Sequence, residues 1–283
     1  MLVKRLDRSA YLSAIIQCGR KEGFSMEGQR VVKSIYETFG FDRFSVFAIT
    51  GGGGKTSLMY AMGRFLSESK KTLLSTTAKI FPPRGLCAIT FVGPANECAA
   101  RLNELPPHSL MTAAKDRTEE KLIGYAPEEI DQIASECAAD KIIVEADGSR
   151  GLPVKAYESW EPPVPRSSQC QIVVAGADAL ARPISGAVAF RLDLLSERYG
   201  IKKGEYLSAA NFAAILSSRC EYLKNSPDDA FRLLLINKGE LLSGTSLDEV
   251  AKCMADSLKG YDALAVASIK EDEVYNLIRL TRG

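Results

Sequence analysis

Short runs of consecutive apolar residues alternate along most of the chain with segments in which apolar residues recur every three or four positions. The first pattern is typical of strands buried on both faces of a parallel sheet, and the second of amphipathic helices. Strands are predicted at 44–50, 72–76, 89–92, 141–146, 171–175, 231–236 and 262–267. Helices are predicted at 55–66, 95–105, 127–138, 207–217, 246–258 and 271–280. Strands that alternate with helices indicate an α/β fold of three layers with a mostly parallel sheet.

A helical segment precedes this alternation. Residues 9–40 have helical spacing in two pieces, one starting near Ser9 and one over 27–39 that ends at Gly40. We therefore divide the chain into a helical N-terminal extension, 1–43, and one α/β domain, 44–283.

The composition narrows the function classes. Acidic and basic residues are mixed and the net charge is +1, which argues against a nucleic-acid partner. Seven cysteines without a Cys-x-x-Cys pair and a single histidine, His108, argue against a disulfide framework or a zinc site. No apolar run approaches the ~20 residues of a membrane span, and the start of the chain lacks a signal-peptide core. We expect a cytoplasmic protein without a membrane partner.

A glycine-rich stretch directly after the 44–50 strand carries the strongest chemical signal. It consists of Gly51, Gly52, Gly53, Gly54, Lys55, Thr56 and Ser57. Glycines let backbone N–H groups converge on phosphate oxygens, and the following helix adds its positive N-terminus. Lys55 would reach the β- and γ-phosphates, and the Thr56 hydroxyl would bind Mg²⁺. The stretch predicts binding of a nucleoside triphosphate, and the alternative is a glycine-rich turn without a ligand.

This stretch departs from the common phosphate-binding loop, Gly-x-x-x-x-Gly-Lys-[Ser/Thr]. Ile49 stands at the first glycine position. The remainder resembles the x-Gly-Gly-x-Gly-Lys-Thr loop of the ParA/MinD and metallochaperone GTPases, with Thr50 where that class often has lysine. Proteins of that class often dimerise around nucleotide, so a homodimer is one expectation.

Two acidic residues end the buried 142–144 run. Glu145 and Asp147 are two positions apart, so they project to the same side of an extended chain. One would hold Mg²⁺ and the other would orient the attacking water, and we favour Asp147 for the metal. The alternative is a pair of solvated acids at a strand end.

Weaker candidates flank these acids. Thr77 could bind Mg²⁺ and Lys79 could contact phosphate, or Ser75 to Thr77 could simply cap the strand end. Arg150 could stabilise charge on a transferring phosphoryl group, with Lys155 and Arg191 as lesser candidates for that role. A salt-bridged loop residue is the alternative for each of these three.

The sequence Asn237-Lys238-Gly239-Glu240 follows a late strand. Guanine-specific GTPases carry Asn-Lys-x-Asp at such a place, where the aspartate binds the guanine ring. Glu240 has the same charge with one more methylene, and a polar turn is the alternative. GTP and ATP both remain open.

The proline-rich segment 153–165 is too rigid for a regular element. It is either an ordered loop over the active edge or a partner-binding surface, with a plain surface connection as the alternative.

Taken in order, five blocks resemble the YqeC-type selenium-dependent hydroxylase accessory family. They lie at 51–56, 75–82, 121–124, 145–155 and 176–180, and the Glu-Ala-Asp-Gly-Ser-Arg-Gly block is the most specific of them. The resemblance implies a three-layer P-loop NTPase fold. It also implies a role in maturing selenium-dependent molybdenum hydroxylases, with the hydroxylase or a cofactor-loading protein as partner.

The chain departs from that family at three places. Ala78 replaces a threonine, Trp160 stands at a histidine position, and the 189–192 stretch lacks a His-Arg-Pro element. Three functions remain: a Mg²⁺-dependent nucleoside triphosphatase acting as a maturation factor, a small-molecule kinase, and a nucleotide-sensing scaffold without turnover.

Overall fold

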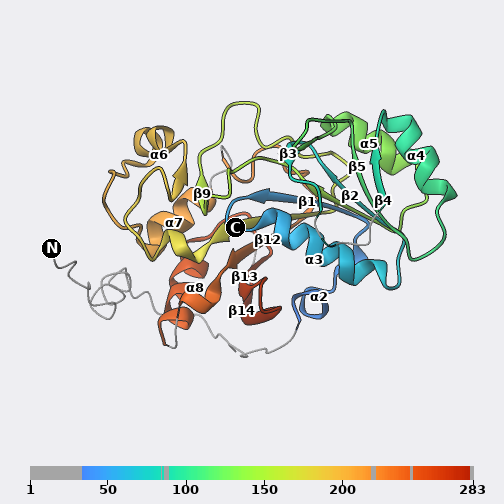
Figure 1. Ribbon diagram of the computed structural model, residues 1–283. Helices are drawn as coiled ribbons and strands as arrows, with labels where there is room; N and C mark the ends of the chain where they lie inside the picture. Colours follow the sequence, from blue (N-terminus) through green and yellow to red (C-terminus); the bar gives the residue numbers. More distant parts are fainter. Residues whose placement is uncertain (1–33, 84, 86–88, 218–220, 243–244, 281–283) are drawn as a thin grey trace.

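The computed structural model describes residues 34–280 apart from 84, 86–88, 218–220 and 243–244 (Figure 1). A nine-stranded sheet forms its centre, in the order β14-β13-β12-β10-β1-β8-β2-β5-β4. Its strands are β1 Val46–Gly51, β2 Thr72–Thr76, β4 Ile89–Val92, β5 Leu110–Ala114, β8 Lys141–Glu145, β10 Cys170–Gly176, β12 Phe231–Asn237, β13 Ala263–Ser268 and β14 Glu273–Arg279. All pairings are parallel except that of β13 with β14. The predicted α/β class is confirmed.

Helices cover both faces of the sheet, which gives three layers. Alternate residues of β1 show the division, since Phe47 and Ile49 pack in the cluster of α2 and α3 whereas Val46 packs in that of α4 and α5. Helices α7 and α8 cover the β10–β12–β13 part of this second face. The helices are α2 Ile35–Thr38, α3 Lys55–Ser67, α4 Ala95–Glu104, α5 Pro127–Glu136, α6 Leu192–Tyr199, α7 Ala209–Leu216 and α8 Thr245–Ser257.

Five further strands are only two residues long. β9 (Val154–Lys155) pairs with β11 (Ala189–Phe190), and β7 (Leu122–Ile123) pairs with both β3 (Lys79–Ile80) and β6 (Asp116–Arg117). These two small sheets were not predicted, and neither were β5 and α6. Single turns η1 (Phe41–Arg43), η2 (Ala177–Ala179) and η3 (Gly239–Leu241) complete the described elements.

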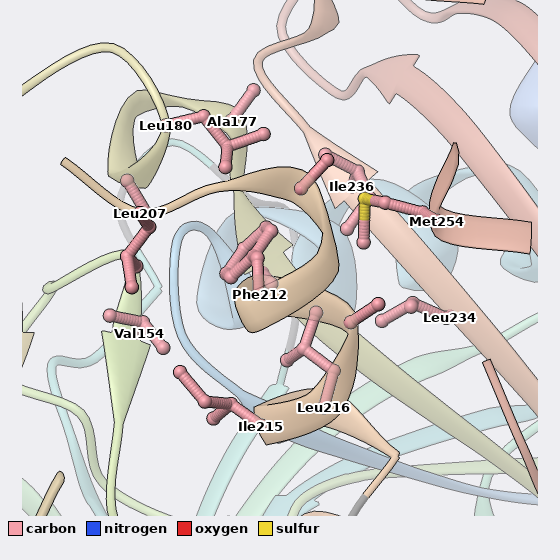
Figure 2. Packing of buried hydrophobic residues seen from close by; sticks show 14 of the residues in the cluster. Val154, Ala177, Leu180, Leu207, Phe212, Ile215, Leu216, Leu234, Ile236 and Met254 are labelled. Atoms are coloured by element: carbon pink, nitrogen blue, oxygen red, sulfur yellow. The ribbon is translucent and has the colours of Figure 1, made fainter. Parts of the chain in front are cut away.

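The largest buried cluster fixes β9 to the main sheet. Figure 2 shows Phe212 of α7 surrounded by side chains that include Val154 of β9, Ile236 of β12 and Met254 of α8. Phe212 and Val154 are completely buried. Burial of that much apolar surface stabilises the position of residues 153–155 against the strand ends.

The predicted helix at 271–280 is wrong, because these residues form strand β14. The pairing of β14 with β13 shifts at Val266/Ala267, which leaves Tyr275 as an extra residue in a β-bulge. The bulge reverses which side chains face which layer. Val274 and Leu277 therefore pack on the α3 face, and Tyr275 and Ile278 on the opposite face. A spacing of three in a strand imitates helical periodicity.

The first predicted helix of the N-terminal extension lies outside the described residues. Of the second, the structure describes only α2, and its Ile35 and Tyr36 pack in the same cluster as α3. Within the residues that the structure describes, no helix is both long and apolar enough to cross a membrane.

Candidate functional site

The glycine loop, residues 51–54, joins β1 to α3 and packs against the ends of two neighbouring strands. Gly53 and Gly54 have φ angles of 71° and 135°, which disfavour other residues. A Cβ on Gly53 would lie 2.4 Å from the nitrogen of Gly176, and one on Gly54 would lie 2.4 Å from Nδ2 of Asn237. The loop therefore requires glycine for packing reasons that hold whether or not a ligand binds.

A cleft of about 970 Å³ opens beside this loop at the carboxyl ends of the strands. In a parallel α/β sheet, this edge is where ligands bind. The cleft brings together many of the predicted site residues: Gly53, Gly54, Lys55, Thr56, Ser57, Glu145, Arg150, Asn237, Lys238 and Glu240. Gly51, Gly52, Asp147 and Thr77 are not among its described lining residues.

Lys55 starts α3 and its side chain is almost fully buried. Its Nζ donates hydrogen bonds to Gly51 O at 2.6 Å and to Ser149 Oγ at 3.1 Å. The same ammonium lies 3.0 Å from Oδ1 of Asp147 and 3.8 Å from Oε1 of Glu145. A cation is thus held at the floor of the cleft by the two acids of the Glu145–Asp147 pair.

Thr56 and Glu145 face each other across the cleft floor. The Thr56 hydroxyl donates a 2.6 Å hydrogen bond to Oε2 of Glu145, and both residues line the cleft. Burial raises the pKa of Glu145, and the nearby charge of Lys55 and the bond from Thr56 offset only part of the rise. The two side chains offer hard oxygen donors to the cleft.

Asp147 lies deeper than its neighbour and is enclosed. Its Oδ2 accepts hydrogen bonds from the N–H of Gly51 at 3.0 Å and from the hydroxyl of Tyr157, and it lies 3.6 Å from Nζ of Lys155. Burial would raise its pKa, but the two lysine charges and these hydrogen bonds outweigh burial and lower it. Neither acid is solvated, and Asp147 is positioned to brace the glycine loop.

Lys155 belongs to a buried charge cluster that the sequence predicts only in part. Its Nζ lies 3.3 Å from Oε1 of Glu161, 2.7 Å from Gly148 O and 4.1 Å from the ring centre of Tyr157. Burial lowers the pKa of Lys155, although Asp147 and Glu161 counteract this.

Tyr157, Ser149 and Glu161 were not predicted as site residues. A lysine and a tyrosine two positions apart, next to Val154 and Ala156, were the available signal.

Asn237 connects β12 to the glycine loop. Its Nδ2 donates to Gly53 O at 2.7 Å, and its Oδ1 accepts from the N–H of Ile269 at 2.9 Å. Lys238 donates to Asp178 at 2.7 Å, and Glu240 lies on the cleft wall. The predicted base-binding residues therefore reach the cleft, with the amide of Asn237 already engaged by protein groups.

Thr77 is not among the described residues that line the cleft. Its hydroxyl donates to Pro163 O at 3.0 Å, and its N–H bonds to Glu145 O.

Arg150 has a positive φ of 54°, lines the cleft and lies 4.9 Å from the ring centre of Phe190. Arg191 also lines the cleft and pairs with Glu161.

The covering segment, residues 153–165, lies over the cleft edge of the sheet. Glu161 lines the cleft, and Val164 packs against Ala48 of β1 and Ala146. Of the alternatives for this segment, the ordered loop over that edge matches the geometry better than a plain surface connection.

A family model described as "YqeC protein" matches residues 47–193. The chain is also 31% identical over 198 residues to a curated protein of Escherichia coli (strain K12) named "Uncharacterized protein YqeC". The aligned region covers 69% of this chain and 77% of that relative. The chain belongs to the YqeC family. The resemblance predicted from the sequence blocks is confirmed.

The part that matches the YqeC family model contains the glycine loop, both acids, Lys155 and the covering segment. Asn237, Lys238 and Glu240 lie beyond it. The side of the cleft at the glycine loop therefore lies in the family region, whereas the side at β12 does not.

The oxygen atoms that line this YqeC-family cleft could supply part of a Mg²⁺ coordination shell. Among the described residues, no group of three or more His, Cys, Asp or Glu side chains is arranged to hold a metal. Mg²⁺ commonly takes only one or two carboxylates and completes its shell with water and substrate phosphates. Thr56 and Glu145 offer such a partial shell.

Proposed function

We propose that the chain binds a nucleoside triphosphate with Mg²⁺ in the cleft and hydrolyses it slowly, as an accessory factor in the maturation of selenium-dependent molybdenum hydroxylases. One observation carries the nucleotide part. Lys55 and Thr56 lie in the first turn of α3, next to Glu145 at the floor of the cleft. The Thr56 hydroxyl donates a hydrogen bond of 2.6 Å to Glu145, and the Lys55 ammonium pairs with Glu145 and Asp147.

The start of α3 would bind the phosphates. Gly54, Lys55, Thr56 and Ser57 line the cleft, and no side chain caps this helix start in the part of the chain that the structure describes. Uncapped N–H groups at a helix N-terminus attract anions. Lys55 would add its charge to the β- and γ-phosphates, which partly replace Asp147 as its partner.

Thr56 and Glu145 would hold the metal. The sequence favoured Asp147 as the metal ligand. Its enclosure beneath the glycine loop supports Glu145 instead, because Glu145 lines the cleft and Asp147 does not. Bound Mg²⁺ would neutralise charge on the β- and γ-phosphates.

Slow turnover follows from the same arrangement. The oxygen Oδ2 of Asp147 is engaged by Gly51, Tyr157 and Lys155, so it is poorly placed to orient an attacking water. Arg150 lies on the cleft wall and would stabilise charge on the γ-phosphoryl group. We expect basal hydrolysis to be weak and to rise with a partner. The enclosure of Asp147 equally favours the second candidate function, a nucleotide-sensing scaffold without turnover.

The hydroxylase part rests on the family resemblance. Membership of the YqeC family supports it, and the expected partner is a molybdenum hydroxylase or a protein that loads its cofactor. Affinity capture of the tagged chain with and without nucleotide, read by mass spectrometry, tests it. Capture of neither kind of protein under either condition would contradict this part alone.

Titration of the purified chain with Mg-ATP and Mg-GTP tests nucleotide binding. We expect Lys55→Ala to abolish it. Because Lys55 also pairs with buried Asp147, Thr56→Val serves as a second variant that keeps side-chain volume and removes only the hydroxyl. Lys203→Ala, at an exposed residue outside the cleft, is the control. No binding of either nucleotide at millimolar concentration would overturn the proposal.

A further inference from the structure

The cleft extends to both sides of the glycine loop. On one side it is lined by Asn237 and Glu240 at the end of β12 and by Lys270 after β13. On the other side it is lined by Lys79 and Phe81 near β3, which follows β2. In the sheet, β12 and β2 lie two strands away from β1 in opposite directions. At about 970 Å³, the cleft is near the upper end of the ~300–1,000 Å³ range of small-molecule pockets.

The part of the cleft formed by the small β3–β7 sheet and by the segment after β8 carries unneutralised positive charge. Lys79, Lys121 and Arg150, here called the cation cluster, all line the cleft. Among the described residues, none of the three has a carboxylate within ion-pair distance. Arg191, by contrast, is paired with Glu161 and lies 3.6 Å from Glu158.

Two aromatic rings hold members of this cluster without neutralising them. Nζ of Lys121 lies 4.8 Å from the ring centre of Phe81, and the guanidinium of Arg150 lies 4.9 Å from that of Phe190. A ring face attracts a cation but carries no net charge, so the cation keeps its attraction for an anion. Phe81 is also 54% exposed and lines the cleft, so its ring is accessible to a ligand there.

A nucleotide in the proposed position leaves this side vacant. If its phosphates lie at the start of α3 and its base lies toward β12, the terminal phosphate points toward β8 and β2. The phosphates already have Lys55 and the helix N-terminus as positive partners, and of the cation cluster only Arg150 would also contact the terminal phosphate. The cation cluster then faces the space beyond the terminal phosphate.

We propose that the cation cluster, with Phe81 and Phe190, forms a second subsite for a small organic oxyanion, such as a phosphorylated or carboxylated molecule, beside the terminal phosphate of the nucleotide. This inference rests on the proposed function for the orientation of the nucleotide. It assigns the cleft two ligands at once, one on each side of the phosphate region.

Calorimetric titration with phenyl phosphate tests the subsite, because this probe pairs an oxyanion with an apolar ring. The full chain is first saturated with a non-hydrolysable Mg-ATP or Mg-GTP analogue, whichever binds. We expect one phenyl phosphate to bind per chain, and Arg150→Ala or Lys121→Ala to weaken it about tenfold or more. Arg166→Ala and Lys203→Ala, at exposed residues outside the cleft, should leave it unchanged.

Three outcomes overturn the inference. They are no binding at millimolar phenyl phosphate, displacement of the probe by the nucleotide analogue, and binding that neither variant weakens. Failure of the proposed function is separable from these. If no nucleotide binds, the same titration on the unliganded chain and on Thr56→Val still shows whether the probe uses the cation cluster or the start of α3.

Discussion

The side-chain amide of Asn237 donates a hydrogen bond of 2.7 Å to the carbonyl of Gly53. Its other end accepts the N–H of Ile269, so one side chain joins β12, the glycine loop and the turn after β13. The bond to Gly53 occurs where Gly54 takes a φ that other residues rarely adopt. Asn237 therefore positions the loop, whatever it contributes to a bound base.

Asn237→Ala should loosen the glycine loop. The substitution leaves the carbonyl of Gly53 and the N–H of Ile269 without their side-chain partner. Each unpaired group should lower the free energy of unfolding by no more than about 1–3 kcal/mol. We expect affinity for both ATP and GTP to fall by about tenfold, measured by titration with fluorescent nucleotide analogues. Asn211→Ala, in the exposed part of α7, is the control. A loss confined to GTP would show instead that the residue reads the base.

Glu145→Gln and Asp147→Asn should separate metal binding from stability. Glutamine keeps an acceptor for the Thr56 hydroxyl, and it avoids the energetic cost of burying an ionised carboxylate. The free energy of unfolding of the unliganded variant, measured with urea, should therefore lie within about 1 kcal/mol of the wild-type value. Its nucleotide binding should no longer depend on Mg²⁺.

Asp147→Asn should act in the opposite way. It leaves Lys55 and Lys155 without their shared buried partner, a change that typically costs about 3–5 kcal/mol. Where the variant still folds, nucleotide binding should keep its Mg²⁺ dependence. Equal loss of that dependence in both variants would contradict the assignment of the metal to Glu145.

The two acids should respond to pH with opposite signs. The pKa of Asp147 is lowered in the folded state, so its contribution to stability is complete above its ordinary pKa of 3.8 and is lost as pH falls through the lowered value. The pKa of Glu145 is raised, so its contribution is greatest below its ordinary pKa of 4.5 and declines as pH rises through that value to the raised one.

Urea unfolding across pH checks these signs. Relative to the wild type, Glu145→Gln should gain stability as pH rises above about 4.5. As pH is lowered, Mg²⁺-dependent nucleotide binding by the wild type should begin to weaken at a higher pH than it would with a carboxyl group of ordinary pKa. A flat difference between wild type and Glu145→Gln across this window would contradict the raised pKa.

Tyr157→Phe should destabilise the fold modestly through Asp147. It removes the hydroxyl that donates to Oδ2 of Asp147 and keeps the ring beneath Lys155, so we expect a loss of about 1–3 kcal/mol. The acid-induced loss of stability should also begin at a higher pH, since one cause of the low pKa of Asp147 is gone. Tyr206→Phe is the matched control outside this cluster. An unchanged acid limb would contradict the coupling.

Glu240→Asp should report which base the cleft prefers. The shorter acid restores the Asn-Lys-x-Asp pattern, and we expect the ratio of GTP to ATP affinity to rise about tenfold, measured by competition titration. An unchanged ratio would mean that the 237–240 turn does not bind guanine.

The strands that end at the cleft were predictable because they are short apolar runs followed by glycines, acids or amides. Gly51–Gly54, Glu145 and Asn237 follow such runs, and the carboxyl ends of parallel strands meet at one edge. The sequence could not reveal that Asp147 lies beneath the loop and Glu145 beside it. Their spacing of two places both side chains on one side, but how deeply each is buried depends on contacts with Lys155 of β9 and with Tyr157, which follows β9.

Other misses have local causes. β5 contains Thr112 between methionine and alanines, so its apolar run is weak. β9 and β11 are too short for any periodicity, and their pairing brings Arg191 to the cleft.

The bulge at Tyr275 has a consequence for assembly. β14 is an edge strand, and an uninterrupted edge offers a row of unpaired backbone groups to which another chain can add a strand. An extra residue in β14 breaks that row and increases its local twist. A second copy of this chain, or a partner with an extended segment, is thereby discouraged from prolonging the sheet at β14, which leaves β4 as the sheet edge open to strand addition.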